Sequence, residues 1–163
     1  MWLIGMMGSG KTTLGSALAT EVGVPFFDTD HIVAAMAGMT IAEIWDQHGE
    51  KGFRRLEKRA VVAVPTSQCV AAAGGGAVLD DESRAKIAAA PPVVWLRCGP
   101  EQLGGRVEVI GRPLLTAGNA LPVLERLARE REPIYRSLAT HQIDTEHTSL
   151  DEALSELIEI WNG

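Results

Sequence analysis

The sequence predicts an α/β fold in three layers, with parallel strands in the middle and helices on both faces. Short apolar runs alternate with longer amphipathic segments along the chain, and the first apolar run leads directly into a glycine-rich turn and a helix. Alternation of strand and helix favours a parallel sheet, because each crossover helix returns the chain to the same end of the sheet. A length of 163 residues suits a single domain, which we expect to span residues 1–163.

Five short apolar runs have the length and composition of buried strands. We expect strands at Trp2–Ile4, Pro25–Phe27, Cys69–Ala73, Val93–Arg97 and, more weakly, Gln142–Asp144. Helical periodicity predicts helices at about Lys11–Val22, Ile41–His48, Glu50–Val62, Glu82–Ala89, Glu101–Val109, Pro122–Leu138 and Leu150–Trp161. Two of these starts carry a capping box, in which a hydroxyl accepts from an orphan backbone N–H: Thr40 with Glu43, and Ser149 with Glu152.

Composition and charge exclude several classes of protein. Hydrophobic residues make up 46% and charged residues 22%, which is typical of a globular chain. The net charge of −6 disfavours nucleic acid and anionic membranes as partners. The acidic excess lies in residues 137–163, which contain no Lys or Arg, so a cationic pocket elsewhere is compatible with it. Cys69 and Cys98 lie in apolar runs without metal-ligand spacing, and we expect buried thiols in a cytoplasmic, monomeric protein without a signal peptide or membrane helix.

A phosphate-binding loop follows the first expected strand. The segment GMMGSGKT, Gly5 to Thr12, matches G-x-x-x-x-G-K-[ST] and opens a helix. Its glycines let the chain curl so that backbone N–H groups point at phosphate oxygens, and the helix N-terminus adds partial positive charge. Lys11 can reach the outer phosphates, and the Thr12 hydroxyl is placed to bind Mg²⁺. The segment therefore predicts a nucleoside-triphosphate site; without sequences typical of GTPases or transporter ATPases, a small kinase is favoured.

The second substrate needs its own residues, and acidic and glycine-rich segments are the candidates. Asp28 and Asp30 come at the end of the second expected strand, where the ends of parallel strands face the ligand crevice. One carboxylate can serve the metal and the other the attacking hydroxyl, although Asp30 can instead cap the helix expected at 31–37. The glycines Gly74, Gly75 and Gly76 stand at the end of the third strand and allow the backbone to approach a ligand closely.

Arginines are further candidates. In the helix over 49–60 only one of Arg54 and Arg55 can face the crevice. Arg112 lies in a Gly-containing stretch, about 104–119, that is a candidate lid, and an arginine on a lid can reach the transferred phosphoryl group on closure. Arg131 lies in a charged helix, where spacing alone favours a solvated side chain.

Taken in order, these segments resemble the shikimate kinase family over essentially the whole chain. The segments that carry the resemblance are GMMGSGKTT, FFDTD, GMTIAEIWDQHGEKGFRRLE, AAAGGGAVL, GRPLL, REREPIYR and QIDT. The resemblance implies a P-loop fold of the nucleoside-monophosphate-kinase type, with a five-stranded parallel sheet, a lid and a shikimate-binding region at about 29–58. It also implies transfer of the ATP γ-phosphoryl group to the shikimate 3-hydroxyl, which gives shikimate 3-phosphate and ADP.

The resemblance also implies a role for particular residues. Shikimate would be held by Asp30, Arg54, Gly75 and Arg131, with Gly74 and Gly76 close by, and Asp30 would be the base. Thr12 would bind Mg²⁺ directly and Asp28 through water. The phosphates would be held by Gly8, Ser9, Gly10, Lys11, Thr12 and Thr13, with Arg112 reaching them from the lid. Ile41, Trp45, Phe53, Glu57, Pro113 and Leu114 match positions that line the acceptor pocket.

Some positions depart from the family pattern, and other functions stay open at this point. Ala72 and Ala73 replace a hydroxyl residue that is frequent before the three glycines, and Glu146 to Thr148 replace a basic residue near the adenine. Arg106 is a candidate contact on the adenine side. The alternatives are a kinase for gluconate or a nucleoside monophosphate, a non-catalytic nucleotide sensor, and a nucleotide-dependent switch that binds a protein partner.

Overall fold

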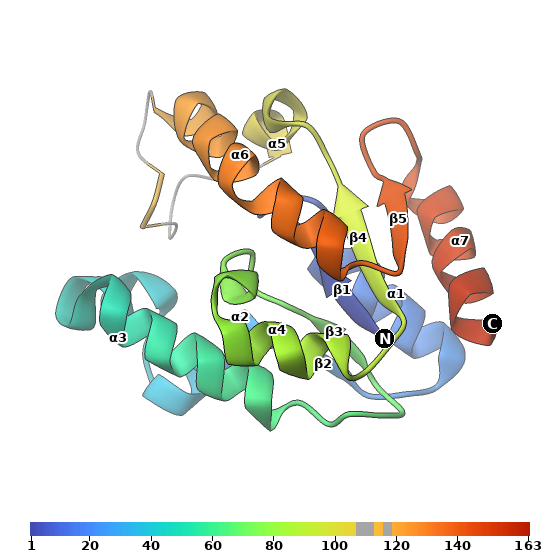
Figure 1. Ribbon diagram of the computed structural model, residues 1–163, viewed down its shortest axis with the longest axis horizontal. Coiled ribbons are helices and arrows are strands. Elements are labelled where there is room, and N and C mark those ends of the chain that lie inside the picture. Colours follow the sequence, from blue (N-terminus) through green and yellow to red (C-terminus); the bar gives the residue numbers. More distant parts are fainter. Residues whose placement is uncertain (107–112, 116–118) are drawn as a thin grey trace.

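The computed structural model describes residues 1–106, 113–115 and 119–163 (Figure 1). Its centre is a five-stranded sheet in the order β2-β3-β1-β4-β5, and all neighbouring strands are parallel. The strands are β1 (Trp2–Ile4), β2 (Phe26–Asp28), β3 (Val70–Ala72), β4 (Val93–Arg97) and β5 (His141–Asp144). Because every strand runs the same way, all five end at one edge of the sheet, where the segments that follow them meet.

Helices cover both faces of the sheet (Figure 1). They are α1 (Lys11–Val22), α2 (Thr29–Ala37), α3 (Ile41–Ala63), α4 (Asp81–Ala88), α5 (Pro100–Arg106), α6 (Ala120–Leu138) and α7 (Leu150–Asn162), with a short 3₁₀ turn, η1, at Ala77–Leu79. The side chains of β4 alternate between the two faces, as a strand requires. Val94 and Leu96 join the core formed with α1 and α7, whereas Val93 and Trp95 join the core that includes α4 and α6.

Helices α2 and α3 form a separate corner beside the sheet, with a small core of their own. Val33 of α2 packs there with Ile44, Phe53 and Ala60 of α3. Gly49 breaks the regular helical geometry of α3 with φ 62° and ψ −176°, a left-handed φ that suits glycine. The bend divides α3 into the two segments that periodicity predicts, and its second half carries Arg54 and Glu57 toward the sheet edge.

The predicted fold class is confirmed, and the differences from the sequence prediction are small. Both capping boxes are present, at Thr40 and Ser149. The possibility that Asp30 caps the helix after β2 is wrong: Asp28 is the N-cap and accepts from the Asp30 N–H at 2.9 Å, so Asp30 lies inside the first turn of α2. Periodicity did not predict η1, which is too short to show it.

The structure describes only part of the expected lid, about 104–119. Residues 107–112 and 116–118, and therefore Arg112, lie outside the described residues. Pro113 and Leu114, which lie between these two ranges, line the same pocket as Asp30.

Within the described parts of the chain, no helix has the length and apolarity needed to cross a membrane.

Candidate active site

The phosphate loop joins the end of β1 to the start of α1. Gly5, Gly8 and Gly10 have φ of 141°, 79° and 92°, which L side chains rarely adopt. Lys11 is buried, and its Nζ donates to the carbonyl oxygens of Gly5 at 2.9 Å and Met6 at 2.7 Å. The loop therefore curls, as its glycines predict, and forms a concave backbone surface suited to phosphate oxygens; here the lysine ammonium is held by two carbonyl oxygens of the loop itself.

Two oxygen donors meet beside this loop. The Thr12 hydroxyl donates to Oδ2 of Asp28 at 2.7 Å, and Oδ1 of Asp28 accepts from the Asp30 N–H at 2.9 Å. Asp28 is buried, and each of its two carboxylate oxygens accepts one of these hydrogen bonds. A hydroxyl and a carboxylate side by side are the hard oxygen ligands that Mg²⁺ prefers, so the pair fits the predicted metal site.

A pocket on the other side of Asp30 has a volume of about 240 Å³. It combines aromatic and aliphatic walls with charged groups, as small-molecule sites do. Its lining residues are Met7, Asp30, Ile41, Trp45, Phe53, Arg54, Glu57, Gly75, Gly76, Pro113, Leu114 and Arg131. The structure thus brings together residues of the phosphate loop, α2, α3, the glycine turn after β3 and α6.

Charged side chains of α3 form one side of this pocket. Nη1 of Arg54 donates to Oε2 of Glu57 at 2.6 Å, and Nη2 pairs with Oε1 of Glu50 at 3.2 Å. Glu57 is only 3% exposed, and this burial raises the pKa of its carboxyl; the nearby Arg54 opposes the rise and Asp30 adds to it. Arg55 is exposed, so Arg54 is the arginine of this helix that lines the pocket.

The three glycines after β3 make room for these charged groups. A Cβ at Gly74 would lie 2.6 Å from Oδ1 of Asp30 and 2.8 Å from Oε1 of Glu57, and a Cβ at Gly76 would overlap the Arg54 guanidinium. The backbone is held by the Gly74 N–H, which donates to the buried Thr29 hydroxyl at 2.8 Å. The glycines were predicted to allow close approach of a ligand; the structure shows that they allow close approach of the pocket's own side chains.

Arg131 closes the pocket from α6. Spacing alone predicted a solvated charge, which is wrong, because Arg131 is only 2% exposed and lines the same pocket as Arg54. Its Nε is buried and has no hydrogen-bond partner among the described residues. A buried guanidinium group with unused donor capacity favours an anionic ligand, since leaving such a donor unpaired is costly.

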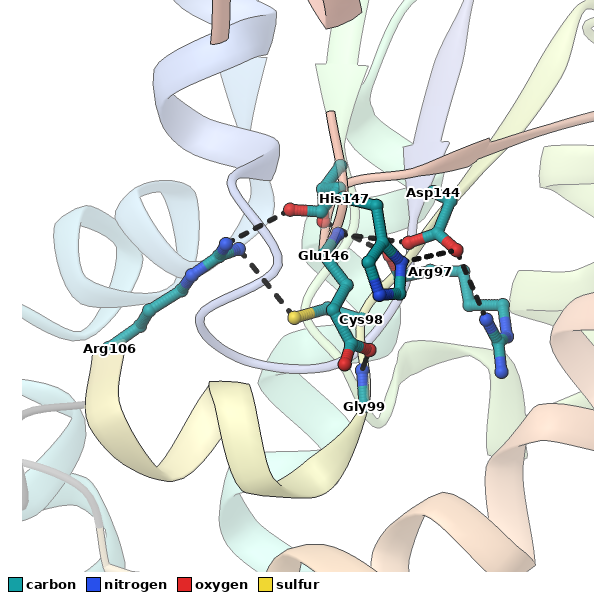
Figure 2. Close-up of polar contacts among 8 residues, drawn as sticks. Arg97, Cys98, Gly99, Arg106, Asp144, Glu146 and His147 are labelled. Atoms are coloured by element: carbon teal, nitrogen blue, oxygen red, sulfur yellow. Dashed lines mark hydrogen bonds and ion pairs between the residues drawn. The ribbon is translucent and has the colours of Figure 1, made fainter. Parts of the chain in front are cut away.

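A further pocket continues from the phosphate loop past α5 to the loop before α7. Its lining residues are Gly8, Ser9, Gly10, Thr13, Leu14, Arg106, Thr145, Thr148, Ser149, Leu150 and Ala153. Figure 2 shows how this side is held: Arg106 donates to the Thr145 carbonyl at 3.0 Å and contacts the Cys98 sulfur at 3.6 Å. The Glu146 carboxylate accepts from the Gly99 N–H at 2.9 Å, so the acidic residue at this departure from the family pattern is tied to the start of α5 (Figure 2).

Sequence reasoning missed several lining residues. Met7 occupies a variable position of the loop motif, so no pattern marked it. Thr145 directly follows β5, just as Asp28 is the last residue of β2. Its position at the end of a parallel strand could have indicated that it lines the site. Leu14, Leu150 and Ala153 look like ordinary core positions of α1 and α7 in the sequence.

Comparison with known proteins agrees with this geometry. A family model for shikimate kinase matches residues 7–162. The chain is 43% identical to shikimate kinases of Thiobacillus denitrificans, over 92% of this chain and 83% of the relative, and of Symbiobacterium thermophilum, over 96% and 92%. The structure of shikimate kinase from Acinetobacter baumannii in complex with shikimate superposes with a TM-score of 0.92 at 32% identity, covering 99% of this chain and 91% of that one. The chain belongs to the shikimate kinase family.

Proposed function

We propose that this chain binds ATP on the phosphate-loop side and shikimate in the pocket between α3 and α6, and that Asp30 joins the two sites. The observation that carries the proposal is the position of Asp30, which lines both the acceptor pocket and a third pocket, the pocket along the phosphate loop, where Lys11, Thr12 and Asp28 also lie. A side chain at this boundary is within reach of the hydroxyl that attacks the γ-phosphorus.

Recognition of shikimate rests on the two arginines of the acceptor pocket. Arg54 and Arg131 come from different helices and both line the pocket, so they can hold the substrate carboxylate between them with paired hydrogen bonds. Asp30 receives a ring hydroxyl, and Gly75 and Gly76 bring the backbone close to the substrate, with Gly74 next to them. Trp45 and Phe53, whose rings lie 5.6 Å apart, supply an apolar wall.

The triphosphate is held mainly by backbone N–H groups of Gly8, Ser9, Gly10, Lys11, Thr12 and Thr13 and by the Lys11 ammonium. The metal ligands are Thr12, directly, and Asp28, through water; their contact at 2.7 Å supports this assignment. Mg²⁺, when bound, neutralises phosphate charge and orients the terminal phosphate. Arg112 lies outside the described residues, and its proposed reach from the lid rests on the motif GRPLL alone.

The transfer then needs little covalent chemistry from the protein. The 3-hydroxyl oxygen forms the new bond to the γ-phosphorus, the bond to the bridging oxygen of ADP breaks, and the hydroxyl proton passes to Asp30. Lys11 stabilises the charge that moves onto the phosphate oxygens. Exclusion of water by the walls of the pocket protects ATP from hydrolysis.

A coupled ADP-release assay tests this function with shikimate, gluconate and nucleoside monophosphates offered separately. We expect turnover with shikimate alone. Turnover with gluconate or a nucleotide instead would identify another acceptor, and tight ATP binding without turnover of any acceptor would favour a nucleotide sensor. Omission of Mg²⁺ should abolish the reaction.

A further inference from the structure

A buried tyrosine hydroxyl connects α6 to the glycine turn. Tyr135 is fully buried, and its hydroxyl donates to the Gly75 carbonyl oxygen at 2.5 Å. Burial raises the pKa of Tyr135 well above its ordinary value, although the nearby Arg131 opposes the rise, so the hydroxyl keeps its proton and remains a donor. Its ring packs against Trp95 with centroids 6.0 Å apart, independently of the hydroxyl.

The carbonyl that accepts this bond belongs to the wall between the two substrate sites. Gly75 lines both the acceptor pocket and the pocket along the phosphate loop. A Cβ at Gly75 would lie 3.4 Å from Nη1 of Arg131 and 3.4 Å from the Gly5 carbonyl oxygen, so the turn is packed closely between α6 and the phosphate loop. A small shift of this turn would therefore change the space beside Arg131.

Tyr135 and Arg131 also lie one helical turn apart on α6. The hydrogen bond of Tyr135 thus fixes the distance between the helix that carries Arg131 and the turn that carries Gly75 and Gly76. At the preceding residue of the turn, the Thr29 hydroxyl accepts from the Gly74 N–H at 2.8 Å. Two buried hydroxyls from different helices, α6 and α2, therefore hold the same turn at neighbouring residues.

We propose that Tyr135 is a positioning residue for the acceptor site: its hydroxyl holds the Gly74–Gly76 turn against α6 and thereby sets the geometry in which Arg131 receives the carboxylate of the acceptor. This inference rests on the proposed function of the pocket. Tyr135 touches no reacting atom in this arrangement, so its loss changes how well the acceptor is bound and leaves the chemical step intact. The Tyr135 hydroxyl contacts Gly75 and, more weakly, the Met6 sulfur at 3.9 Å. The groups proposed to hold the phosphates, Gly8 to Thr13, lie further along the loop, so ATP binding should depend on Tyr135 less than acceptor binding does.

The test is the variant Tyr135→Phe, which removes one oxygen and keeps the ring. We expect the KM for shikimate to rise about tenfold, while kcat and the KM for ATP change less than twofold, because acceptor binding depends on the turn through Arg131, whereas the phosphates are held mainly by the loop from Gly8 to Thr13. Thr140→Val is the matched control: the Thr140 hydroxyl also bridges two segments, donating to the Val93 carbonyl at 3.0 Å, but lies outside both substrate pockets. This control should leave both KM values unchanged.

The variant Thr29→Val tests the same turn independently of α6. We expect it to raise the KM for shikimate as well. In the double variant the KM should rise by less than the product of the two single increases, because both hydroxyls hold the same Gly74–Gly76 turn. Thermal unfolding of each variant separates loss of fold from loss of geometry.

An unchanged KM for shikimate in Tyr135→Phe would overturn the proposal, and so would an equal rise in both KM values, which would indicate general loosening. If the wild type turns over shikimate and Tyr135→Phe behaves like it, only this inference fails. Absence of turnover by the wild type would overturn the proposed function, and this inference with it.

Discussion

The two substrate sides of this molecule are built in different ways. The phosphate side is more local: one loop, Gly5 to Thr13, supplies the proposed phosphate contacts, largely through backbone groups, and Asp28, Ala73 and Arg106 also line its pocket. The acceptor side is dispersed: its charged groups Asp30, Arg54, Glu57 and Arg131 come from three helices and are packed before a ligand arrives. Binding of ATP should therefore tolerate side-chain changes that binding of shikimate does not.

The largest effect is expected at Asp30, where the two sides meet. Asp30→Asn keeps the shape of the side chain but removes the base, and we expect kcat to fall about 100-fold or more, the usual range for loss of a general base. Steady-state kinetics with both substrates varied measures it, and Asp46→Asn, an exposed position of α3, is the control. Turnover near that of the wild type would remove Asp30 from this role.

Adjacent arginines on α3 offer a sharper test of the acceptor side. Arg54 lines the pocket and Arg55 is exposed, one residue further along the same helix. Arg54→Lys keeps the charge but loses the planar pair of donors, and we expect the KM for shikimate to rise about tenfold with the KM for ATP little changed. Arg55→Lys should leave both values as they are. Equal effects of the two substitutions would show that net charge, and not the geometry of Arg54, matters.

The same contrast explains what the sequence could predict. The fold class, the phosphate loop and the strand ends follow from short-range patterns, and the structure has them within a few residues of the expected places. Arg131 shows the limit: helical spacing favours a solvated arginine, and its burial becomes visible only when α6 packs on the glycine turn. The resemblance to the family selected Arg54 and Arg131, because it supplies long-range information that periodicity lacks.

Glu57, which only the family resemblance placed at the acceptor pocket, shows why helical spacing alone does not predict such contacts. A glutamate on a charged helix is ordinarily solvated, yet here it is packed between Arg54 and Asp30, as the close approach to Gly74 shows. Met7 is a similar case, since an apolar residue in the variable part of a loop motif carries no signal. Tertiary packing determines both positions.

Burial of Glu57 also predicts a pH dependence of stability. Its pKa is raised above the ordinary 4.5, so the folded protein holds this proton at pH values where the unfolded chain has released it. The contribution of Glu57 to the free energy of unfolding is therefore largest below about pH 4.5 and falls as pH rises through the raised pKa. Glu57→Gln cannot titrate, so relative to this variant the Tm of the wild type should fall as pH rises from acidic to neutral.

Thermal unfolding at a series of pH values, with wild type and variant compared at each, isolates Glu57 from the other carboxyls. Glu50→Gln is the control, because Glu50 also pairs with Arg54 but is exposed. A difference in Tm between wild type and Glu57→Gln that stays constant with pH would contradict the raised pKa. Such a result would indicate that Glu57 stays ionised in the folded protein over the pH range measured.

The smallest effect is expected on the phosphate side, at Ser9. Its side chain is fully buried, and Oγ has no hydrogen-bond partner among the residues the structure describes. If Ser9 holds phosphate through its backbone N–H alone, Ser9→Ala should change the KM for ATP less than twofold and should not lower Tm, because it removes a buried polar atom without a partner. Thr12→Val is the contrasting variant, since the Thr12 hydroxyl contacts Asp28, and it should raise the Mg²⁺ concentration needed for half-maximal rate. A rise of about tenfold in the KM for ATP in Ser9→Ala would mean that side chains matter as much on the phosphate side as on the acceptor side, and the proposed contrast between the two would be lost.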